Sequence, residues 1–447
     1  MINNRWLKII GPLVINNRFF GMYLERWLSA LILIVKWGKP SPFNKLTPAI
    51  ENLAQRAIVS AGPKGSDSKD IIFVNRYFMQ GQIGGVNFLI ALMAFGLASR
   101  GHKVQILCES PRPWQMRTNF HGVDIVGLRP RFIFVNQTSP ALYAGWSKAV
   151  FDYCKSRELE GTEINIFATI AGLETLGTEI LPRQFNSICY LVTDHLIHKF
   201  GIESKEKPTR RMAKFFESER YYLMSPSIKV IADSGAIVRD LSKVLELPKL
   251  IQKSSILPIG WPKNSHVSPI TLPEGKIITC IGSVSFRKGT RTLIEAWLEL
   301  SKDEDNSECH LLICGPTSDD HETENLIRQH ASNSRIERIT KMTEEEKNYI
   351  LENSDLVVIP SNYESFGIVA VEAMQKGCQI IASNVGGLTE VLQNAAVFFE
   401  AGNSIELAQR IRQSLNGETL RLKVDILEQG KKFDFQRMLK SFEIELY

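Results

Sequence analysis

Short apolar segments alternate with segments of helical composition through the second half of this 447-residue chain, and this alternation limits the folds open to it. The apolar segments are rich in β-branched residues and are bounded by turn residues, which predicts strands at residues 277–281, 310–314, 355–359 and 379–382. The last of these strands is followed by the glycine pair Gly386 and Gly387, with a helix expected from near Thr389. Strands separated by helices favour a doubly wound α/β fold, in which a parallel sheet carries helices on both faces. Ligands of such sheets bind where the strands end, so a binding site is expected in the loops that follow them.

The segment PSNYESFGIVAVEAM, residues 360–374, follows the third of these strands and opens a helix. Ser365 is the expected N-cap of that helix, because serine accepts hydrogen bonds from amides of the first turn. These amides lack partners inside the helix and lie at the positive end of its dipole, so they suit a phosphate. They belong to Phe366, Gly367 and Ile368. Gly367 also allows a ligand to approach the backbone closely.

Two carboxylates, Glu364 and Glu372, flank this expected phosphate site. Carboxylates accept hydrogen bonds from neighbouring hydroxyl groups, so one glutamate suits a ribose and the other a hexose, with a diphosphate between them. The alternative is that Glu364 is a loop charge and Glu372 a solvated helix charge. The joint occurrence of strand, cap, glycine and helix favours a nucleotide-sugar site.

The loop after the first of these strands, GSVSFRKGT, carries two adjacent cations, Arg287 and Lys288. An arginine binds a diphosphate through its planar fork, and a lysine binds it as a point charge. Gly282 begins the loop, and a helix is expected from about Thr290. Such a pair is often ordinary surface charge, but its place directly after a strand favours diphosphate binding.

A second alternation occurs in the first half of the chain. Expected strands at 71–74 and 104–108 enclose a glycine loop and a helix over 86–99, and further strands are expected at 187–192, 230–232 and 257–261. Gly84 and Gly85 do not complete a dinucleotide fingerprint, but their loop would face donor phosphates or an acceptor. Asp194 and His195 follow a strand end, where they either contact substrate or are common turn residues.

These motifs resemble the signature of the retaining GT-B glycosyltransferases of family 4. The resemblance rests on PSNYESFG, ESFGIVAVE and EAMQKGCQIIASNVGGLTEVL; it runs unbroken from about Lys276 to Phe399 and is weaker from Ile71 to Gly260. In the family, the loop that corresponds to GSVSFRKGT, here called the donor loop, usually has an arginine directly after its first glycine. Here Ser283 stands there, and Arg287 is the expected substitute.

The resemblance implies two Rossmann-like doubly wound domains facing a central cleft, with the donor held mainly by the second. The expected donor contacts are Glu372 for the ribose, Arg287, Lys288, Gly282 and the amides after Ser365 for the diphosphate, and Glu364 for the sugar. Gly84, Gly85 and His195 would shape the acceptor side, with His195 favoured by the resemblance. The implied reaction is a front-face departure in which the leaving phosphate helps to deprotonate the acceptor.

The length of the chain suits two cores of about 150–200 residues each. The expected parts are an extension over 1–68, a first domain over 69–262, a linker over 263–275, a second domain over 276–431 and a helix over 432–447 that returns to the first domain. The last helix would place Phe435, Met438, Leu439 and Phe442 on one side. The alternative is that it caps the second domain.

The seven cysteines include no CxxC pair, which disfavours a disulfide framework or a zinc site and favours a reducing cytoplasm. The eight histidines show no metal-ligand spacing, so neither a metal nor another cofactor is expected. Arg287, Lys288 and the helix dipoles would instead stabilise the leaving nucleotide. Nucleic-acid binding is disfavoured, because basic residues beyond the extension are balanced by acids.

The net basicity lies in the extension. Its first 50 residues hold seven Lys or Arg against one Glu, a net +6, while the whole chain carries +5. Its longest apolar run, nine residues between Arg26 and Lys36, is shorter than the roughly 20 residues that a membrane span needs. A basic, aromatic-rich segment of this kind suits the surface of an anionic membrane, which residues 1–60 would bind, or it packs on the first domain or on a partner.

We therefore expect a glycosyltransferase that moves a sugar from a nucleotide sugar to a hydroxyl acceptor with retention, in the biosynthesis of a polysaccharide, glycolipid or other glycoconjugate. It would act in the cytoplasm, at the inner face of the membrane if the extension binds lipid. One alternative is an epimerase or phosphorylase of the same fold. Another is a non-catalytic scaffold, which the intact Glu364, Gly367, Glu372 and Lys288 disfavour.

Overall fold

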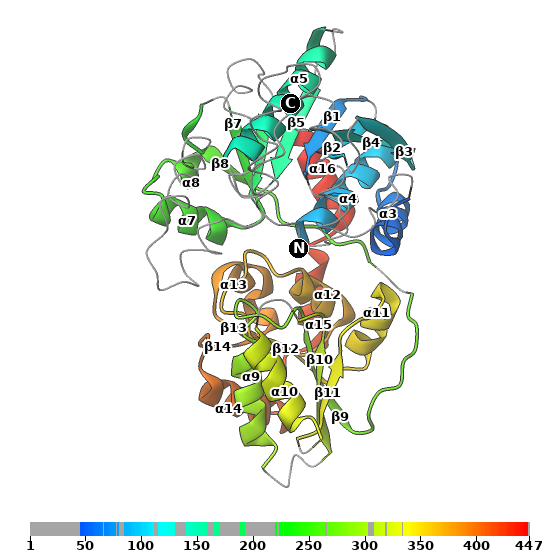
Figure 1. Ribbon diagram of the computed structural model, residues 1–447. Helices are drawn as coiled ribbons and strands as arrows, with labels where there is room; N and C mark the ends of the chain where they lie inside the picture. Colours follow the sequence, from blue (N-terminus) through cyan, green and yellow to red (C-terminus); the bar gives the residue numbers. More distant parts are fainter. Residues whose placement is uncertain are drawn as a thin grey trace, which may run out of the picture. The chain divides into compact units, whose positions relative to one another are not determined.

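The computed structural model describes residues 45–65, 67–76, 78–79, 85–110, 115–129, 140–159, 164–169, 188–192, 220, 223–226, 228–263, 266–302, 308–317, 320–332 and 334–445. The described residues form two compact units. One comprises the chain up to Leu191 with the segment that ends at Val230, and the other runs from Ile231 to the end of the description (Figure 1). Gly84, Asp194, His195 and the first 44 residues of the extension lie outside the described residues.

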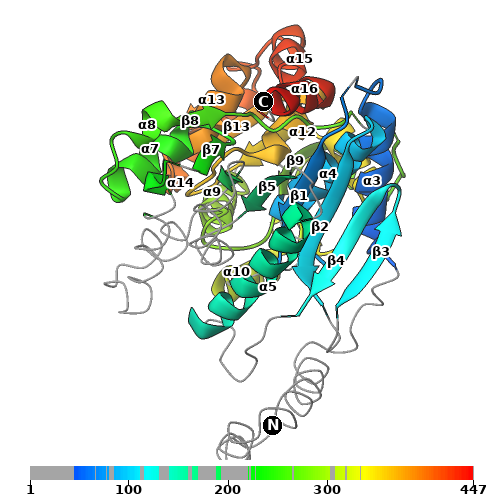
Figure 2. The ribbon, with the colours of Figure 1, turned by 90° about the horizontal axis from the view of Figure 1, so that it is seen from above.

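The first sheet has eight strands in the order β3-β4-β2-β1-β5-β6-β7-β8 among the described residues. Its strands are β1 (Asp70–Val74), β2 (Lys103–Glu109), β3 (Met116–Phe120), β4 (Val123–Leu128), β5 (Ile164–Thr169), β6 (Ile188–Val192), β7 (Ile228–Ala232) and β8 (Ser254–Ile256). From β4 through β2, β1 and β5 to β6 the pairing is parallel, whereas β3 runs antiparallel to β4. Figure 2 shows β3, β4, β2 and β1 side by side.

The helices of the first unit are α3 (Pro48–Ser60), α4 (Gly85–Ser99) and α5 (Pro140–Leu159), while α7 (Gly235–Val244) and α8 (Leu250–Lys253) follow β7 and belong to the second unit. Helix α3 begins after Thr47, whose side chain accepts a hydrogen bond from the amide of Ile50, and it has Pro48 in its first turn. Its buried residues recur at helical spacing, and this face packs against α4. Residues 48–60 of the expected extension are therefore packed on the fold.

The second sheet has six parallel strands in the order β11-β10-β9-β12-β13-β14. They are β9 (Lys276–Ile281), β10 (Cys309–Cys314), β11 (Ile336–Ile339), β12 (Leu356–Ile359), β13 (Ile380–Ser383) and β14 (Val397–Phe399). The helices and the 3₁₀ turn η5 between and after them are α9 (Thr290–Leu300), α10 (His321–His330), α11 (Glu344–Glu352), α12 (Ile368–Lys376), α13 (Gly386–Leu392), η5 (Gln393–Ala395), α14 (Ser404–Leu415), α15 (Lys423–Lys431) and α16 (Phe435–Glu445).

Alternate residues of the second sheet point to opposite faces, as strand geometry requires. Ile278 and Leu311 belong to a buried cluster with residues of α9, α10 and α14, while Ile277 and Leu312 belong to another with Ile350 of α11. Helices therefore cover both faces of this sheet (Figure 1). Each strand is buried on two sides, which explains why its sequence reads as a continuous apolar run.

The structure confirms most of the expected elements and corrects others. The predicted strands of the second half correspond to β9, β10, β12 and β13, and the helix predicted from Thr290 is α9. The expected strand at 257–261 is wrong, because β8 ends at Ile256 and only Trp261 forms an isolated bridge, with Asp434. Helix α16 buries Phe435, Met438, Leu439 and Phe442, as its spacing predicts.

In the described part of the chain, no helix has the length and the apolar character that crossing a membrane requires.

Trp297 of α9 lies in the centre of the larger cluster, where it is 1% exposed and donates from Nε1 to the carbonyl of Ser334 at 2.7 Å. We expect Trp297→Ala to lower the free energy of unfolding by about 3–5 kcal/mol, because it leaves a cavity and an unpaired carbonyl. Urea unfolding followed by circular dichroism measures this change. Ile405→Ala, at a side chain that is 83% exposed, is the control and should change stability by less than about 0.5 kcal/mol. Equal effects of the two substitutions would contradict the assignment of this core.

Candidate functional site

The turn after β9 and the segment after β12 meet through their backbones. The amide of Asn362 donates to the carbonyl of Arg287 at 2.9 Å, and its side-chain amide donates to the carbonyl of Phe286 at 2.7 Å. Gly289 has a φ of 64°, and a Cβ at this position would lie 1.8 Å from the carbonyl oxygen of Pro360. Only glycine permits this approach, so Gly289 fixes the cations of the turn beside the segment that carries Glu364.

Glu364 lies between the two predicted cations. Its Oε2 accepts from Nζ of Lys288 at 2.5 Å, and its Oε1 lies 3.7 Å from a guanidinium nitrogen of Arg287. Ser361 contributes a longer hydrogen bond of 3.5 Å. Burial alone would raise the pKa of the Glu364 carboxyl, but Lys288 and Arg287 lower it, and the net effect holds this pKa below its usual range. The cluster is therefore ionised at neutral pH and carries a net positive charge.

The N-cap of α12 lies two residues after the serine that the sequence predicts. It is Gly367, in a left-handed conformation with a φ of 96° and no side-chain cap hydrogen bond, so the prediction of Ser365 as the N-cap is wrong. The positive φ favours glycine here, and a Cβ on Gly367 would also lie 2.6 Å from Cδ2 of Leu388 in α13. The amides that head the helix are thus those from Ile368 onward rather than from Phe366.

The glycine pair after β13 has a structural role. Helix α13 begins at Gly386, three residues before the position near Thr389 that the composition suggests. The amide of Gly387 donates to the carbonyl of Glu364 at 2.9 Å, and a Cβ on Gly387 would lie 1.9 Å from the carbonyl of Ser365. The pair therefore lets α13 contact the backbone on which Glu364 is mounted.

Glu372 lies on the buried side of α12 and is 5% exposed. Its Oε1 accepts from Nζ of Lys347 on α11 at 2.6 Å. The second predicted carboxylate is thus also paired with a lysine that comes from a different element.

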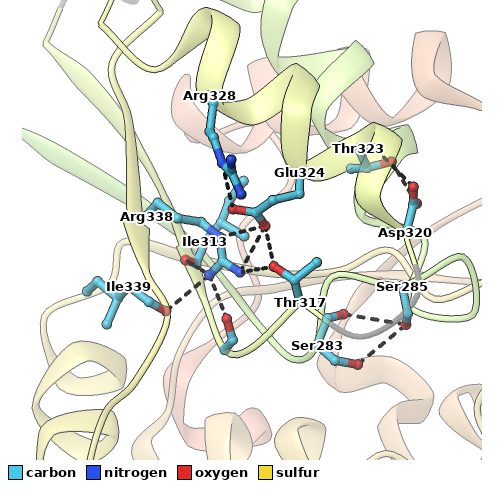
Figure 3. Close-up of polar contacts among 11 residues, drawn as sticks. Ser283, Ser285, Ile313, Thr317, Asp320, Thr323, Glu324, Arg328, Arg338 and Ile339 are labelled. Atoms are coloured by element: carbon cyan, nitrogen blue, oxygen red, sulfur yellow. Dashed lines mark hydrogen bonds and ion pairs between the residues drawn. The ribbon is translucent and has the colours of Figure 1, made fainter. Parts of the chain in front are cut away.

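A third polar cluster holds the turn after β10 (Figure 3). Arg338 of β11 donates to the carbonyls of Ile313, Gly315 and Ile339 at 3.1, 2.6 and 3.1 Å. It also pairs with Glu324 at 3.2 Å, and the same carboxylate accepts from Oγ1 of Thr317 at 2.6 Å. One arginine therefore joins the ends of two neighbouring strands to the start of α10.

The turn that this third cluster stabilises also forms backbone hydrogen bonds with the donor loop. The amide of Gly282 donates to the carbonyl of Cys314 at 2.8 Å, and the amide of Val284 donates to that of Pro316 at 2.8 Å. A Cβ on Gly315 would lie 2.2 Å from the carbonyl oxygen of Gly282. The loop that carries Arg287 and Lys288 therefore packs against the turn after β10, which Arg338 stabilises through its hydrogen bonds.

The structure brings Gly282, Arg287, Lys288, Glu364, Ser365, Phe366, Gly367 and Ile368 together at the carboxyl edge of the six-stranded sheet, with Glu372 on the adjoining helix. Gly85 begins α4 in the other compact unit, and Gly84 and His195 lie outside the described residues. Sequence reasoning missed Lys347, Ser361 and Arg338. Lys347 had a signal, because it precedes Ile350 and Leu351 by three and four residues and so shares their inward face.

Comparison with known proteins shows that this chain is similar to glycosyltransferases. The family model described as glycosyl transferases group 1 matches residues 264–433. An uncharacterised glycosyltransferase of Methanocaldococcus jannaschii is 32% identical over 323 residues, which cover 70% of this chain and 80% of the relative. A D-inositol 3-phosphate glycosyltransferase of Corynebacterium diphtheriae is 23% identical, over 81% of this chain and 89% of the relative.

The fold is also found among solved structures. Sucrose-phosphate synthase from Thermosynechococcus elongatus superposes with a TM-score of 0.66 at 19% identity, over 84% of this chain and 97% of that one. At this identity the likeness shows the fold, which is the GT-B arrangement of two Rossmann-like parts.

The pairing of Glu364 predicts a pH-dependent stability. Because its folded-state pKa lies below the ordinary value of 4.5, the ion pairs stabilise the fold fully above pH 4.5, and this contribution is lost as the pH falls through the folded-state pKa. We expect Glu364→Gln to cost about 1.5–3 kcal/mol at pH 7, since it removes the charged partner of two partly exposed cations. The difference from the wild type should shrink in urea titrations below pH 4.5.

The control is Glu295→Gln, which breaks an exposed pair with Arg291 of 3.0 Å and should cost no more than about 1 kcal/mol at any pH. A constant difference between wild type and Glu364→Gln from pH 7 down to pH 3 would show that the carboxylate is not stabilised by its cations.

Proposed function

The chain belongs to the group 1 glycosyltransferases, and from this premise we propose that it moves a sugar from a nucleotide sugar to a hydroxyl acceptor with retention of the anomeric configuration. The observation that carries the proposal is the Glu364 cluster, in which two cations and a buried carboxylate lie at the carboxyl edge of a parallel sheet. Cations there suit a diphosphate, and a carboxylate fixed beside them suits the hydroxyls of the transferred sugar.

The remaining donor contacts follow from the elements around this cluster. Helix α12 begins at Ile368, and its first amides lie at the positive end of its dipole, where they would share the diphosphate with Arg287 and Lys288. Glu372 would accept hydrogen bonds from the ribose hydroxyls. Gly282 begins the loop that carries these cations, and a Cβ at this position would lie 3.7 Å from Cδ of Lys288.

The proposed chemistry is positioning and charge stabilisation. Glu364 is held by Lys288 and Arg287, so it is placed to bind sugar hydroxyls rather than to attack the anomeric carbon. The departing phosphate would then take the acceptor proton on the same face, which retains the configuration. Lys288 and Arg287 would stabilise the leaving nucleotide in the role that a divalent cation fills elsewhere, so no metal is proposed.

The acceptor is proposed to be a hydroxyl compound, and phosphorylated polyols are the first class to test. This choice is supported by the printed names of two similar proteins, a D-inositol 3-phosphate glycosyltransferase and a sucrose-phosphate synthase. His195, Gly84 and Gly85 remain the proposed acceptor-side residues. Lipid-linked acceptors are the second class, since residues 1–44 are basic and apolar and are proposed to bind an anionic membrane surface in the cytoplasm.

The donor site is tested by titrating the protein with UDP, GDP and ADP in a calorimeter, without metal. We expect one of them to bind, and Glu372→Ala to weaken its binding at least tenfold, because hydrogen bonds to a carboxylate contribute about 1.5–3 kcal/mol. Glu352→Ala, on the adjacent helix α11, is the control and should leave the affinity unchanged. Binding that survives Glu372→Ala would remove this residue from the donor site.

Retention is tested by nuclear magnetic resonance of the glycosylated product. With the nucleotide sugar that binds and a phosphorylated polyol acceptor, we expect the anomeric proton of the product to show the configuration of the donor, and we expect equal rates with and without EDTA. An inverted product would overturn the front-face mechanism. Conversion of the donor without any acceptor would favour an epimerase.

A further inference from the structure

Lys347 occupies a position where a lysine is unexpected. It lies in α11 on the inward face that Ile350 and Leu351 also share, and only 8% of it is exposed. Removing an ammonium group from water is costly unless carboxylates compensate for the lost hydration. A lysine in such a place therefore depends on specific partners.

Two carboxylates and an aromatic ring surround its ammonium group. Nζ lies 2.6 Å from Oε1 of Glu372 and 2.9 Å from the carboxylate of Glu344, and it is 6.0 Å from the centroid of the Trp261 ring. Burial alone would lower the pKa of Lys347, but Glu372 and Glu344 raise it, and the net pKa lies above the ordinary value. Lys347 is charged at neutral pH.

The local structure holds Lys347 in this position. Helix α11 starts with a capping box, in which Thr343 accepts from the amide of Glu346 at 3.1 Å and Glu346 accepts from the amide of Thr343 at 2.6 Å. On the other helix, Gln375 lies one turn after Glu372 and donates to the carbonyl of Trp261 at 3.0 Å. Both sides of the Lys347–Glu372 pair are thus anchored by further hydrogen bonds.

The ammonium group of Lys347 is a counter-charge that lies directly against Glu372. This carboxylate is 5% exposed, and without a cation, burial would favour its protonated form. A protonated carboxyl donates one hydrogen bond, whereas an ionised one only accepts and has room for several donors. Two neighbouring hydroxyl groups are both donors, so a diol is recognised best by a carboxylate that stays ionised and oriented.

A second lysine links the same two helices. Lys376 of α12 pairs with Glu352 of α11 at 2.5 Å. The side chain of its partner Glu352 is 40% exposed, whereas that of Glu372 is 5% exposed. Lys376 therefore provides a matched comparison for Lys347.

We infer that Lys347 is a positioning residue that keeps Glu372 ionised and oriented, and that it thereby makes the site select ribonucleotides over 2′-deoxyribonucleotides. This inference rests on the proposed function, in which Glu372 binds the ribose. Lys347 itself need not touch the nucleotide, because its effect is exerted through the Glu372 carboxylate.

The test compares two affinities for each variant of the full chain. The probes are the nucleoside diphosphate among UDP, GDP and ADP that binds most tightly, and its 2′-deoxy counterpart, each titrated by calorimetry. We expect the wild type to prefer the ribonucleotide by about tenfold or more, as the loss of a hydrogen bond to a charged group implies. Lys347→Met should reduce this preference to less than threefold, while Lys347→Arg should keep most of it and Lys376→Met all of it.

The substitution Lys347→Met removes the cation that pairs with the buried Glu372 and the partly exposed Glu344, so the double variant Glu344→Gln with Lys347→Met provides a second test with one of these charges removed. It should also lose the preference.

If either folded variant binds both nucleotides more weakly but keeps the wild-type preference, Lys347 is merely structural and the inference is overturned. A wild type that binds ribo- and deoxyribonucleotides equally overturns it as well. A wild type that binds none of the three diphosphates instead contradicts the proposed function on which the inference rests.

Discussion

The candidate site depends on loops whose backbones touch at the carboxyl edge of the six-stranded sheet. Gly289 approaches Pro360, and Gly387 approaches Ser365, so closely that a Cβ would lie 1.8 and 1.9 Å from the facing carbonyl oxygens. Contacts between backbones fix relative positions more firmly than contacts between long side chains, which lose conformational entropy when they are held. Glu364 and its cations are therefore mounted on loops whose places are set before any ligand arrives.

Charge compensation is the second condition that the site meets. Glu364 and Glu372 are both nearly buried, and each is paired with a lysine from another element, at 2.5 and 2.6 Å. Isolated in the same places, these carboxylates would tend to take up protons and lose their capacity as pure acceptors. Their lysines, Lys288 and Lys347, thus hold both carboxylates in place at the proposed donor site.

Local rules failed where a neighbouring element decided the backbone. Serine is a good N-cap, but the N-cap of α12 is Gly367, whose φ of 96° favours glycine and which faces Leu388 of α13. The start of α13 was expected near Thr389, yet the helix begins at Gly386, where the glycines allow it to meet the Glu364 segment. In both cases the missing information was the position of a segment about 20 residues away along the chain.

The sequence by itself determined the parallel α/β character of the second half, the strands that end in functional loops, and the residues at which a donor was expected, including Glu364, Arg287 and Lys288. It could do so because periodicity and turn residues are local properties of the chain. Only the tertiary structure decided which charges are paired. Lys347 reaches Glu372 from another helix, and Arg338 braces the donor loop from another strand, because such pairings depend on packing between elements that local sequence does not encode.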